Sequence, residues 1–118
     1  MADLKLKIAR YKTLLNKLIE ELAKERNTSQ GAILEYQAIA DLKENHFLLV
    51  RTGWHERKFH YLVLLHLDLK SDGKIWIQQN NTELRLDEML AKKGIDPDDW
   101  VLGFRPDWMR HITAVETA

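Results

Sequence analysis

The chain has 118 residues, no cysteine, and 18 lysines and arginines against 18 aspartates and glutamates. This length suits one ordinary domain over residues 1–118, and the lack of cysteine excludes a disulfide framework, a thiol nucleophile and a thiolate zinc site. The balanced charge argues against a protein that holds nucleic acid mainly through a global basic field.

The chain shows no pattern of a membrane or secreted protein. Its longest unbroken apolar run extends only from Tyr61 to Leu65, which is too short to span a membrane. The N-terminus carries a charged amphipathic pattern and not a secretory signal. We therefore expect a cytoplasmic protein without a membrane partner.

Apolar residues at spacings of three and four predict a long amphipathic helix over the first 26 residues. Asp3 is placed to cap its start, and the polar cluster at 27–31 ends it. The chain's own sheet is expected to bury the stripe, with a neighbouring helix of an oligomer as the alternative. Self-association through this helix or through a sheet edge stays open. The stripe consists of Leu4, Ile8, Tyr11, Leu15, Leu18 and Leu22.

Between residues 33 and 79 the apolar period changes to two, and β-branched and aromatic residues multiply, which predicts strands. Turns are expected at Asn45, at 53–56 and at 71–73. Because short turns cannot join parallel strands, the sheet should be an antiparallel meander of about four to five strands. The strands are expected over residues 33–40, 46–52, 59–69 and 74–79.

The strand at 59–69 carries apolar residues on both of its faces. Odd-numbered positions from Phe59 to Leu67 should share one face, and even-numbered positions from His60 to Asp68 the other. We therefore expect an interior strand with cover on both sides of the sheet.

A second, short helix is expected after the turn at 80–82, which also provides its N-cap. Leu86, Met89 and Leu90 form its apolar face, and Gly94 is placed to stop it. Residues 101–104 would then form a last short strand before a tail. The predicted fold class is α+β, with a long N-terminal amphipathic helix, a meander sheet, a short helix, and a short C-terminal strand and tail.

His66 and Asp68 lie two residues apart on one strand face, with His60 six residues before His66. An imidazole and a carboxylate at this spacing could converge on a divalent metal. No third and fourth ligand stand at a recognisable spacing. We expect instead a strand histidine hydrogen-bonded to a neighbouring acid, and neither a metal nor a cofactor.

The other reactive residues form no complete catalytic set. Asp68 with Lys70, like Asp72 with Lys74, matches the acid-x-lysine half of a nuclease strand. The second acid that would share Mg²⁺ has no supporting pattern. A Mg²⁺-dependent nuclease that uses Asp68 and Lys70 stays open as a weaker alternative to a protein that is not an enzyme.

Trp54 and Trp108 stand beside turns or breaks, where a large ring is a candidate for an interface. A small cluster in the tail would also suit single-stranded nucleic acid through stacking and charge, namely Arg105, Trp108, Arg110 and His111. Because this cluster is small and the chain is neutral, a protein-binding tail is the preferred interpretation.

Five runs of the chain form a distinctive set: TGW at 52–54, LHLDL at 65–69, GKIWIQQNNTE at 73–83, GI at 94–95 and DWVLGF at 99–104. Together they closely resemble the XisI family, the fdxN-element excision controlling factors of cyanobacteria. The longest run, at 73–83, is unusual enough to make a chance match improbable. Departures from the family pattern at Leu84-Arg85, Trp100 and Arg105 concern partner specificity and not the fold.

The resemblance implies an accessory factor, and not a catalyst, in the programmed excision of a DNA element during heterocyst development. Such factors are typically found beside XisH, a family that resembles endonucleases, so an XisH-type protein is the implied partner. An inhibitor or antitoxin-like role would fit the same contact. Direct DNA binding, with the first helix on phosphates and the tail on bases, is the alternative. The expected partner-binding residues are Trp54, His66, Asp68, Arg105, Trp108 and Arg110.

Overall fold

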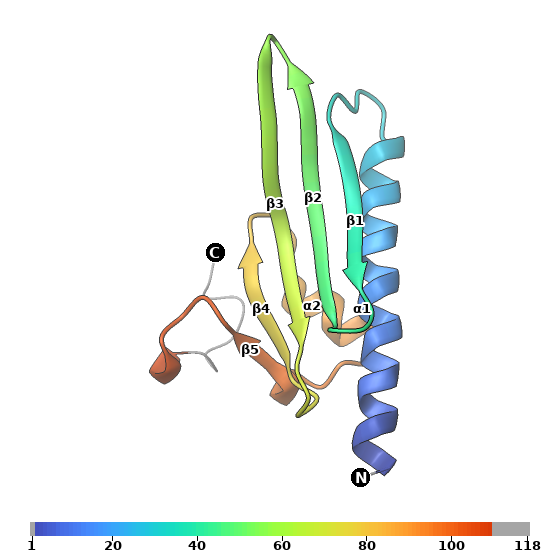
Figure 1. The fold of residues 1–118 in the computed structure, drawn as a ribbon, viewed down its shortest axis with the longest axis vertical. Coiled ribbons are helices and arrows are strands. Elements are labelled where there is room, and N and C mark those ends of the chain that lie inside the picture. Colours follow the sequence, from blue (N-terminus) through green and yellow to red (C-terminus); the bar gives the residue numbers. More distant parts are fainter. Residues whose placement is uncertain (1, 110–118) are drawn as a thin grey trace.

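The computed structural model describes residues 2–109, which form a mixed α+β structure as predicted (Figure 1). None of the helices in this range is both long and apolar enough to cross a membrane. In chain order the elements are α1 (Ala2–Thr28), β1 (Glu35–Asp41), β2 (His46–His55), β3 (Lys58–Leu69), β4 (Ile75–Asn80), α2 (Leu86–Lys92), the 3₁₀ helix η1 (Pro97–Asp99), β5 (Trp100–Leu102) and the 3₁₀ helix η2 (Asp107–Met109).

The strands form one sheet in the order β1-β2-β3-β4-β5. From β1 to β4, a short turn joins each strand to the next, and consecutive strands pair antiparallel, as predicted for a meander. β5 differs because it pairs parallel with β4, with Trp100 opposite Ile75. The chain reaches this position by crossing over through α2, so the expected last strand lies outside the meander.

The two α-helices lie on the same side of the sheet and bury its inner face. Tyr11, Leu15 and Leu18 of α1 are almost fully buried in one cluster with Leu65 and Leu67 of β3. Each fully buried leucine contributes about 1.5–3 kcal/mol relative to an exposed one. The chain's own sheet therefore buries the helical stripe, which confirms the first of the two expectations.

The β2–β3 hairpin turns at Glu56 and Arg57, whose φ angles are 52° and 66°. Two consecutive positive φ angles are typical of the tight two-residue turn whose twist matches that of the flanking strands. The expected turn at 53–56 is wrong, because Gly53 lies inside β2. At Gly53 φ is 140°, and an added Cβ would lie 3.3 Å from Cδ2 of Leu34, so the glycine permits a close approach within the strand.

A β-bulge in β3 changes which side chains share a face. Leu49 of β2 lies opposite Leu65, but its neighbour Val50 lies opposite Val63, so Leu64 is the extra residue. Leu64 and Leu65 are both buried in the core beneath the helices. The expected strict alternation is therefore wrong. On the outer face of the sheet, which is the face opposite the helices, β3 places its odd-numbered residues before the bulge and its even-numbered residues after it.

This bulge also explains why β3 is covered on one side only. β3 is interior in the sheet, as predicted. However, Phe59 and Tyr61 are 51% and 65% exposed. The prediction that both sides of β3 are covered is wrong, because these two rings lie on the face of the sheet opposite the helices and are exposed there.

The second helix starts later than the sequence pattern indicates. Thr82 lies in the predicted turn and accepts a hydrogen bond from the backbone N–H of Leu84 at 3.2 Å. The residue at the N-cap position is Arg85, which makes no side-chain capping hydrogen bond, so the predicted N-cap is wrong. The stop at Gly94 is confirmed, since its φ of 82° lies in the left-handed region that ends many helices.

A buried polar network ties α1 to the segment after α2. The nearly buried carboxylate of Asp99 accepts hydrogen bonds from the Tyr11 hydroxyl at 2.6 Å and from Lys7 Nζ at 2.9 Å. The Asp96 N–H donates to the same tyrosine oxygen at 3.2 Å. Burial, together with the hydrogen bond to Asp99, raises the pKa of Tyr11. The network joins the two ends of the fold through groups that must stay paired.

The variant Tyr11→Phe should lower the free energy of unfolding by about 1–3 kcal/mol, because the buried carboxylate of Asp99 would lose a donor. Urea unfolding at neutral pH measures this loss. The matched control is Tyr61→Phe on the exposed outer face, where we expect a change within about 0.5 kcal/mol. Equal stability of Tyr11→Phe and the unaltered protein would contradict the role of the network.

Candidate functional site

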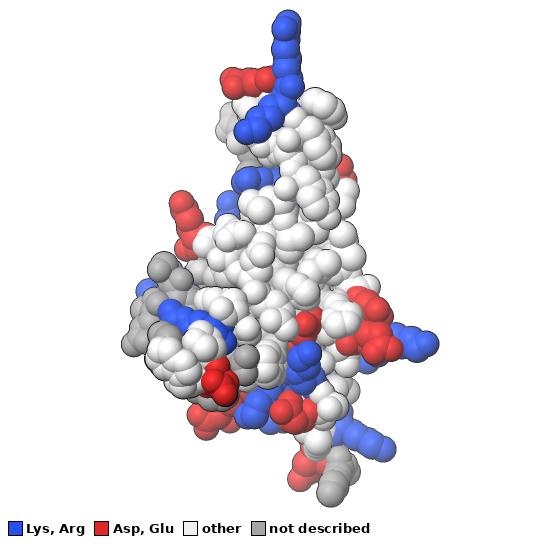
Figure 2. Space-filling view, turned by 60° about the vertical axis from the view of Figure 1, so that its left-hand side comes forward, with Lys and Arg blue, Asp and Glu red and all other residues white. Residues whose placement is uncertain are grey.

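The sheet face opposite the helices, here called the open face, exposes several large apolar side chains. Trp54 and Tyr61 are 68% and 65% exposed on it. Figure 2 shows a long surface without Lys, Arg, Asp or Glu that runs down from a charged tip. The exposed apolar side chains of the open face are Ile39, Trp54, Phe59 and Tyr61; Leu48 and Val63 on the same face are half-buried, and Val50 is buried between its neighbours.

Three aromatic rings gather near the tip of the β2–β3 hairpin. Trp54 and Phe59 are cross-strand partners, with ring centroids 5.3 Å apart and planes tilted by 55°. Tilted pairs of this kind stabilise each other beyond their burial. Tyr61 lies two residues further along β3 on the same face. Because the strands already hold these rings in place, covering them with another protein costs little conformational entropy.

The hairpin also presents an unpaired strand edge. β4 pairs only with Leu65–Leu69 of β3. Within the part of the chain that the structure describes, residues 58–62 of β3 therefore have no strand neighbour on that side. An exposed edge of this kind can accept a further strand through main-chain hydrogen bonds.

At the other end of the open face, a cluster of polar side chains surrounds Asp68. Its Oδ1 accepts hydrogen bonds from His46 Nδ1 at 2.7 Å and from His66 Nε2 at 2.8 Å, and its Oδ2 accepts one from Gln78 Nε2 at 3.0 Å. The expected bond between His66 and Asp68 is thus present. The sequence pattern missed His46, which reaches Asp68 because the two residues are cross-strand partners.

The hydrogen bonds decide the ionisation of Asp68, which is only 6% exposed. Burial alone would raise the pKa of this carboxyl. The hydrogen bonds from His46, Gln78 and His66 outweigh burial and hold the pKa below its usual value of 3.8.

His46, His66 and Asp68 could hold a divalent cation, since their ligand atoms lie within 4.8 Å of one another. In the structure both histidine rings hydrogen-bond to the carboxylate of Asp68. His60, the third residue considered from the sequence, lies elsewhere, with its ring 6.4 Å from that of His55. The two cluster histidines also border an apolar hollow of about 340 Å³ beside Ile39.

The acid-x-lysine pairs have structural roles in this fold. Lys70 Nζ lies 5.6 Å from the ring centre of Trp76, where a cation is attracted to the aromatic face. Lys74 Nζ donates to the carbonyl of Asp98 at 3.1 Å, and Asp72 accepts from the Lys74 N–H within the β3–β4 turn. These contacts occupy the groups that the nuclease alternative requires.

The six expected contact residues fall into two separate places. Trp54, His66 and Asp68 share the open face but lie toward its opposite ends. His46, the strand partner of Asp68, stands eight residues before Trp54 in β2, which corresponds to about 26 Å at about 3.3 Å per residue. Trp108, which is 77% exposed, belongs to η2, and Arg105 stands in the chain between β5 and η2. This segment follows the last strand of the sheet and lies away from the hairpin tip (Figure 1). Arg110 lies outside the described residues.

The lowered pKa of Asp68 predicts an acid-dependent loss of stability. A carboxyl with a depressed folded-state pKa stabilises the fold above its unfolded value of 3.8, and this contribution is lost as the pH falls through the lower folded value. Urea unfolding from pH 7 to pH 2 should show a smaller acid-dependent loss for Asp68→Asn than for the unaltered protein. Asp98→Asn, which changes an exposed carboxyl, should leave the loss unchanged. An identical pH profile for Asp68→Asn would contradict the cluster geometry.

Other proteins of known sequence and structure are similar to this chain and share its fold. The chain matches the family model described as XisI protein over residues 6–116. It is similar in structure to a XisI-like protein from Anabaena variabilis ATCC 29413, with 34% sequence identity, a TM-score of 0.78, and coverage of 90% of this chain and 94% of that chain. No curated protein matches the chain.

A second solved structure, the fdxN element excision controlling factor XisI from the same organism, shares 25% sequence identity. Its TM-score is 0.72, and the alignment covers 91% of this chain and 95% of that chain. The resemblance that the sequence motifs indicate is therefore confirmed. Because the family match spans nearly the whole chain, and one solved relative shares 34% identity over most of it, the chain belongs to the XisI family.

Proposed function

We propose that this chain is a non-catalytic controlling factor of DNA-element excision that binds an XisH-type protein through its open face. A solved relative bears the name excision controlling factor. A protein can control a reaction by contacting the molecule that carries it out. The proposal places the pair in the cytoplasm, together with the DNA.

The exposed aromatic rings of the open face carry this proposal. Large contiguous apolar patches are rare on monomeric proteins and commonly mark interaction sites. Trp and Tyr are enriched among the residues that contribute most to binding energy, since they bury a large ring and retain a polar group. Trp54 and Tyr61 lie on this face beside Phe59.

The unpaired edge of β3 suggests how the partner is oriented. A strand of the partner could extend the sheet at residues 58–62 while its side chains cover the aromatic rings. Occupying a nuclease-like partner in this way would give the inhibitory or antitoxin-like role. The same edge could instead pair with a second copy of this chain. Arg105 and Trp108 remain proposed contacts of a separate, smaller patch.

The structure weakens the case for direct DNA binding through the first helix. Lys7 is bound to Asp99, and Arg10 donates to the carbonyl of Gly94 at 3.2 Å and lies over the ring of Tyr11. These cations are therefore committed to contacts within the fold, which reduces the charge that α1 can offer to phosphates.

Replacing the aromatic rings should weaken partner binding. We expect Trp54→Ala and Tyr61→Ala each to reduce the affinity for a co-expressed XisH-type protein by about tenfold or more. Calorimetry on the purified proteins measures this affinity. Leu6→Ala is the matched control, since Leu6 is 69% exposed but lies on α1, and it should bind normally. Trp108→Ala should cause a smaller loss, and full binding by both aromatic variants would refute the assignment of the surface.

Gel shift of the isolated protein separates contact with a partner from contact with DNA. We expect no binding of duplex or single-stranded DNA at low salt, where electrostatic binding is strongest. Affinity for DNA that falls steeply with added salt would instead support the nucleic-acid alternative. Cleavage of DNA with Mg²⁺ that is lost in Asp68→Ala would support the nuclease alternative.

A further inference from the structure

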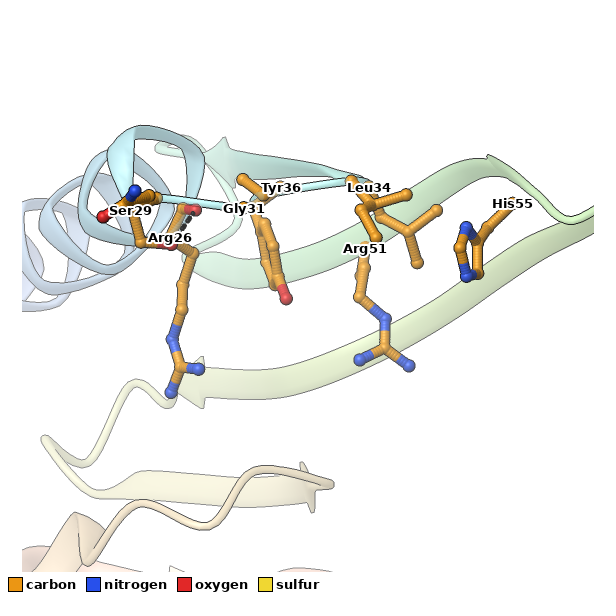
Figure 3. Close-up of a pocket in the computed structure, with 10 residues that line it drawn as sticks. Arg26, Ser29, Gly31, Leu34, Tyr36, Arg51 and His55 are labelled. Atoms are coloured by element: carbon orange, nitrogen blue, oxygen red, sulfur yellow. Dashed lines mark hydrogen bonds between the residues drawn. The ribbon is translucent and has the colours of Figure 1, made fainter.

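We propose that Arg26, Tyr36 and Arg51 form a binding site for a phosphate group, either free phosphate or the terminal phosphate monoester of a small molecule. The site is a hollow of about 290 Å³ beside the end of α1 (Figure 3). It lies on the helix side of the sheet, opposite the open face, so its test is independent of the proposed partner binding.

The fold brings these three residues together from separate elements. The side chain of Asn27 donates to the Tyr36 carbonyl and accepts from the Tyr36 N–H, both at 2.8 Å, which fixes the last turn of α1 against β1. Tyr36 lies directly opposite Arg51 in the β1–β2 register. Figure 3 shows the side chains of Arg26, Tyr36 and Arg51 extending toward the same side of the hollow.

The two arginines have no counter-ion within the part of the chain that the structure describes. Neither guanidinium takes part in an ion pair there. The Nε atom of Arg51 is buried and has no hydrogen-bond partner among residues 2–109. A buried donor without a partner destabilises the fold, and more so when the group is charged. A bound anion would supply the counter-charge that the two guanidinium groups lack.

Charge around the hollow favours an anion. No acidic residue of the range 2–109 lines the hollow, whose remaining lining comes from the loop at 29–34 and from His55. Glu56 lies 3.7 Å from His55, but its side chain is exposed to solvent. An adjoining hollow shares Arg26, Tyr36 and Arg51 and is also lined by Glu83, which makes no ion pair with either arginine within residues 2–109. The arginines therefore stand on the border between two hollows, where a ligand can reach them from solvent.

The chemistry of the donors favours phosphate over carboxylate. A guanidinium presents several N–H groups in a planar fork, and one fork already matches the two oxygens and single charge of a carboxylate. Two forks and the Tyr36 hydroxyl offer a double positive charge and more donors than a carboxylate can accept. A phosphate monoester carries about −1.5 to −2 charge at pH 7 and three oxygens that accept strongly.

Inorganic phosphate and 5′-AMP are the probes for this site, with acetate as the carboxylate comparison at equal ionic strength. We expect saturable NMR shifts at Tyr36 and Arg51 with phosphate, and a rise in the unfolding temperature as phosphate is added. Arg51→Met and Arg26→Gln should each weaken phosphate binding by about tenfold or more, since each removes charge-assisted hydrogen bonds. The control Arg57→Gln removes an exposed arginine at the hairpin turn and should bind phosphate normally.

The result with 5′-AMP identifies the source of the phosphate group. Tighter binding of 5′-AMP than of inorganic phosphate would indicate a small molecule that carries a terminal phosphate, and the reverse order would indicate free phosphate. Equal or tighter binding of acetate would overturn the choice of phosphate. Absence of saturable binding in the unaltered protein, or normal phosphate binding by a folded Arg26→Gln variant, would overturn the site. Arg26 lies on the exposed side of α1, so this variant tests the site even where Arg51→Met fails to fold.

Discussion

The apolar stripe of α1 packs against one face of the sheet, and this contact determines which face is buried and which is exposed to solvent. Tyr11, Leu15 and Leu18 fill the inner face together with residues of α2. Both α-helices of the described chain are used on that side. A sheet face that no helix covers is commonly polar, and large exposed apolar side chains gathered on such a face commonly mark a contact surface. The outer face carries Trp54 and Tyr61, so it is suited to contact with another protein.

Polar contacts at the two ends of α1 fix this layer in place. Asp99 holds Tyr11 near one end, and the side chain of Asn27 holds β1 at the other. The fixed helix end also places Arg26 beside Arg51, which forms the cationic hollow on the inner side. The chain thus offers two chemically different surfaces on opposite sides of one sheet. An apolar protein surface and a phosphate group could occupy them at the same time, which would suit a factor that responds to a small ligand while bound to its partner.

The sequence predicts the element types well because their apolar periods are strong. The apolar spacing from Leu4 to Leu22 predicts a helix, and Gly94 predicts the end of a helix, without any knowledge of the rest of the fold. The bulge at Leu64 could not be predicted, because it depends on how β2 and β3 align and leaves no mark in the apolar pattern. His46 and Arg51 were missed for the same reason, since only strand register places them beside Asp68 and Tyr36. Family resemblance, and not spacing, supplied the functional hypothesis.

Amide hydrogen exchange on this protein, with and without a bound XisH-type protein, shows whether the partner covers the open face. We expect slower exchange of the backbone amides in the hairpin half of β3, at residues 58–62, because the partner would cover the open face and its unpaired edge. Exchange in the middle of α1 should stay the same, because the sheet already buries its apolar stripe. Protection confined to α1 or to η2, with an unchanged hairpin, would show that the partner binds elsewhere.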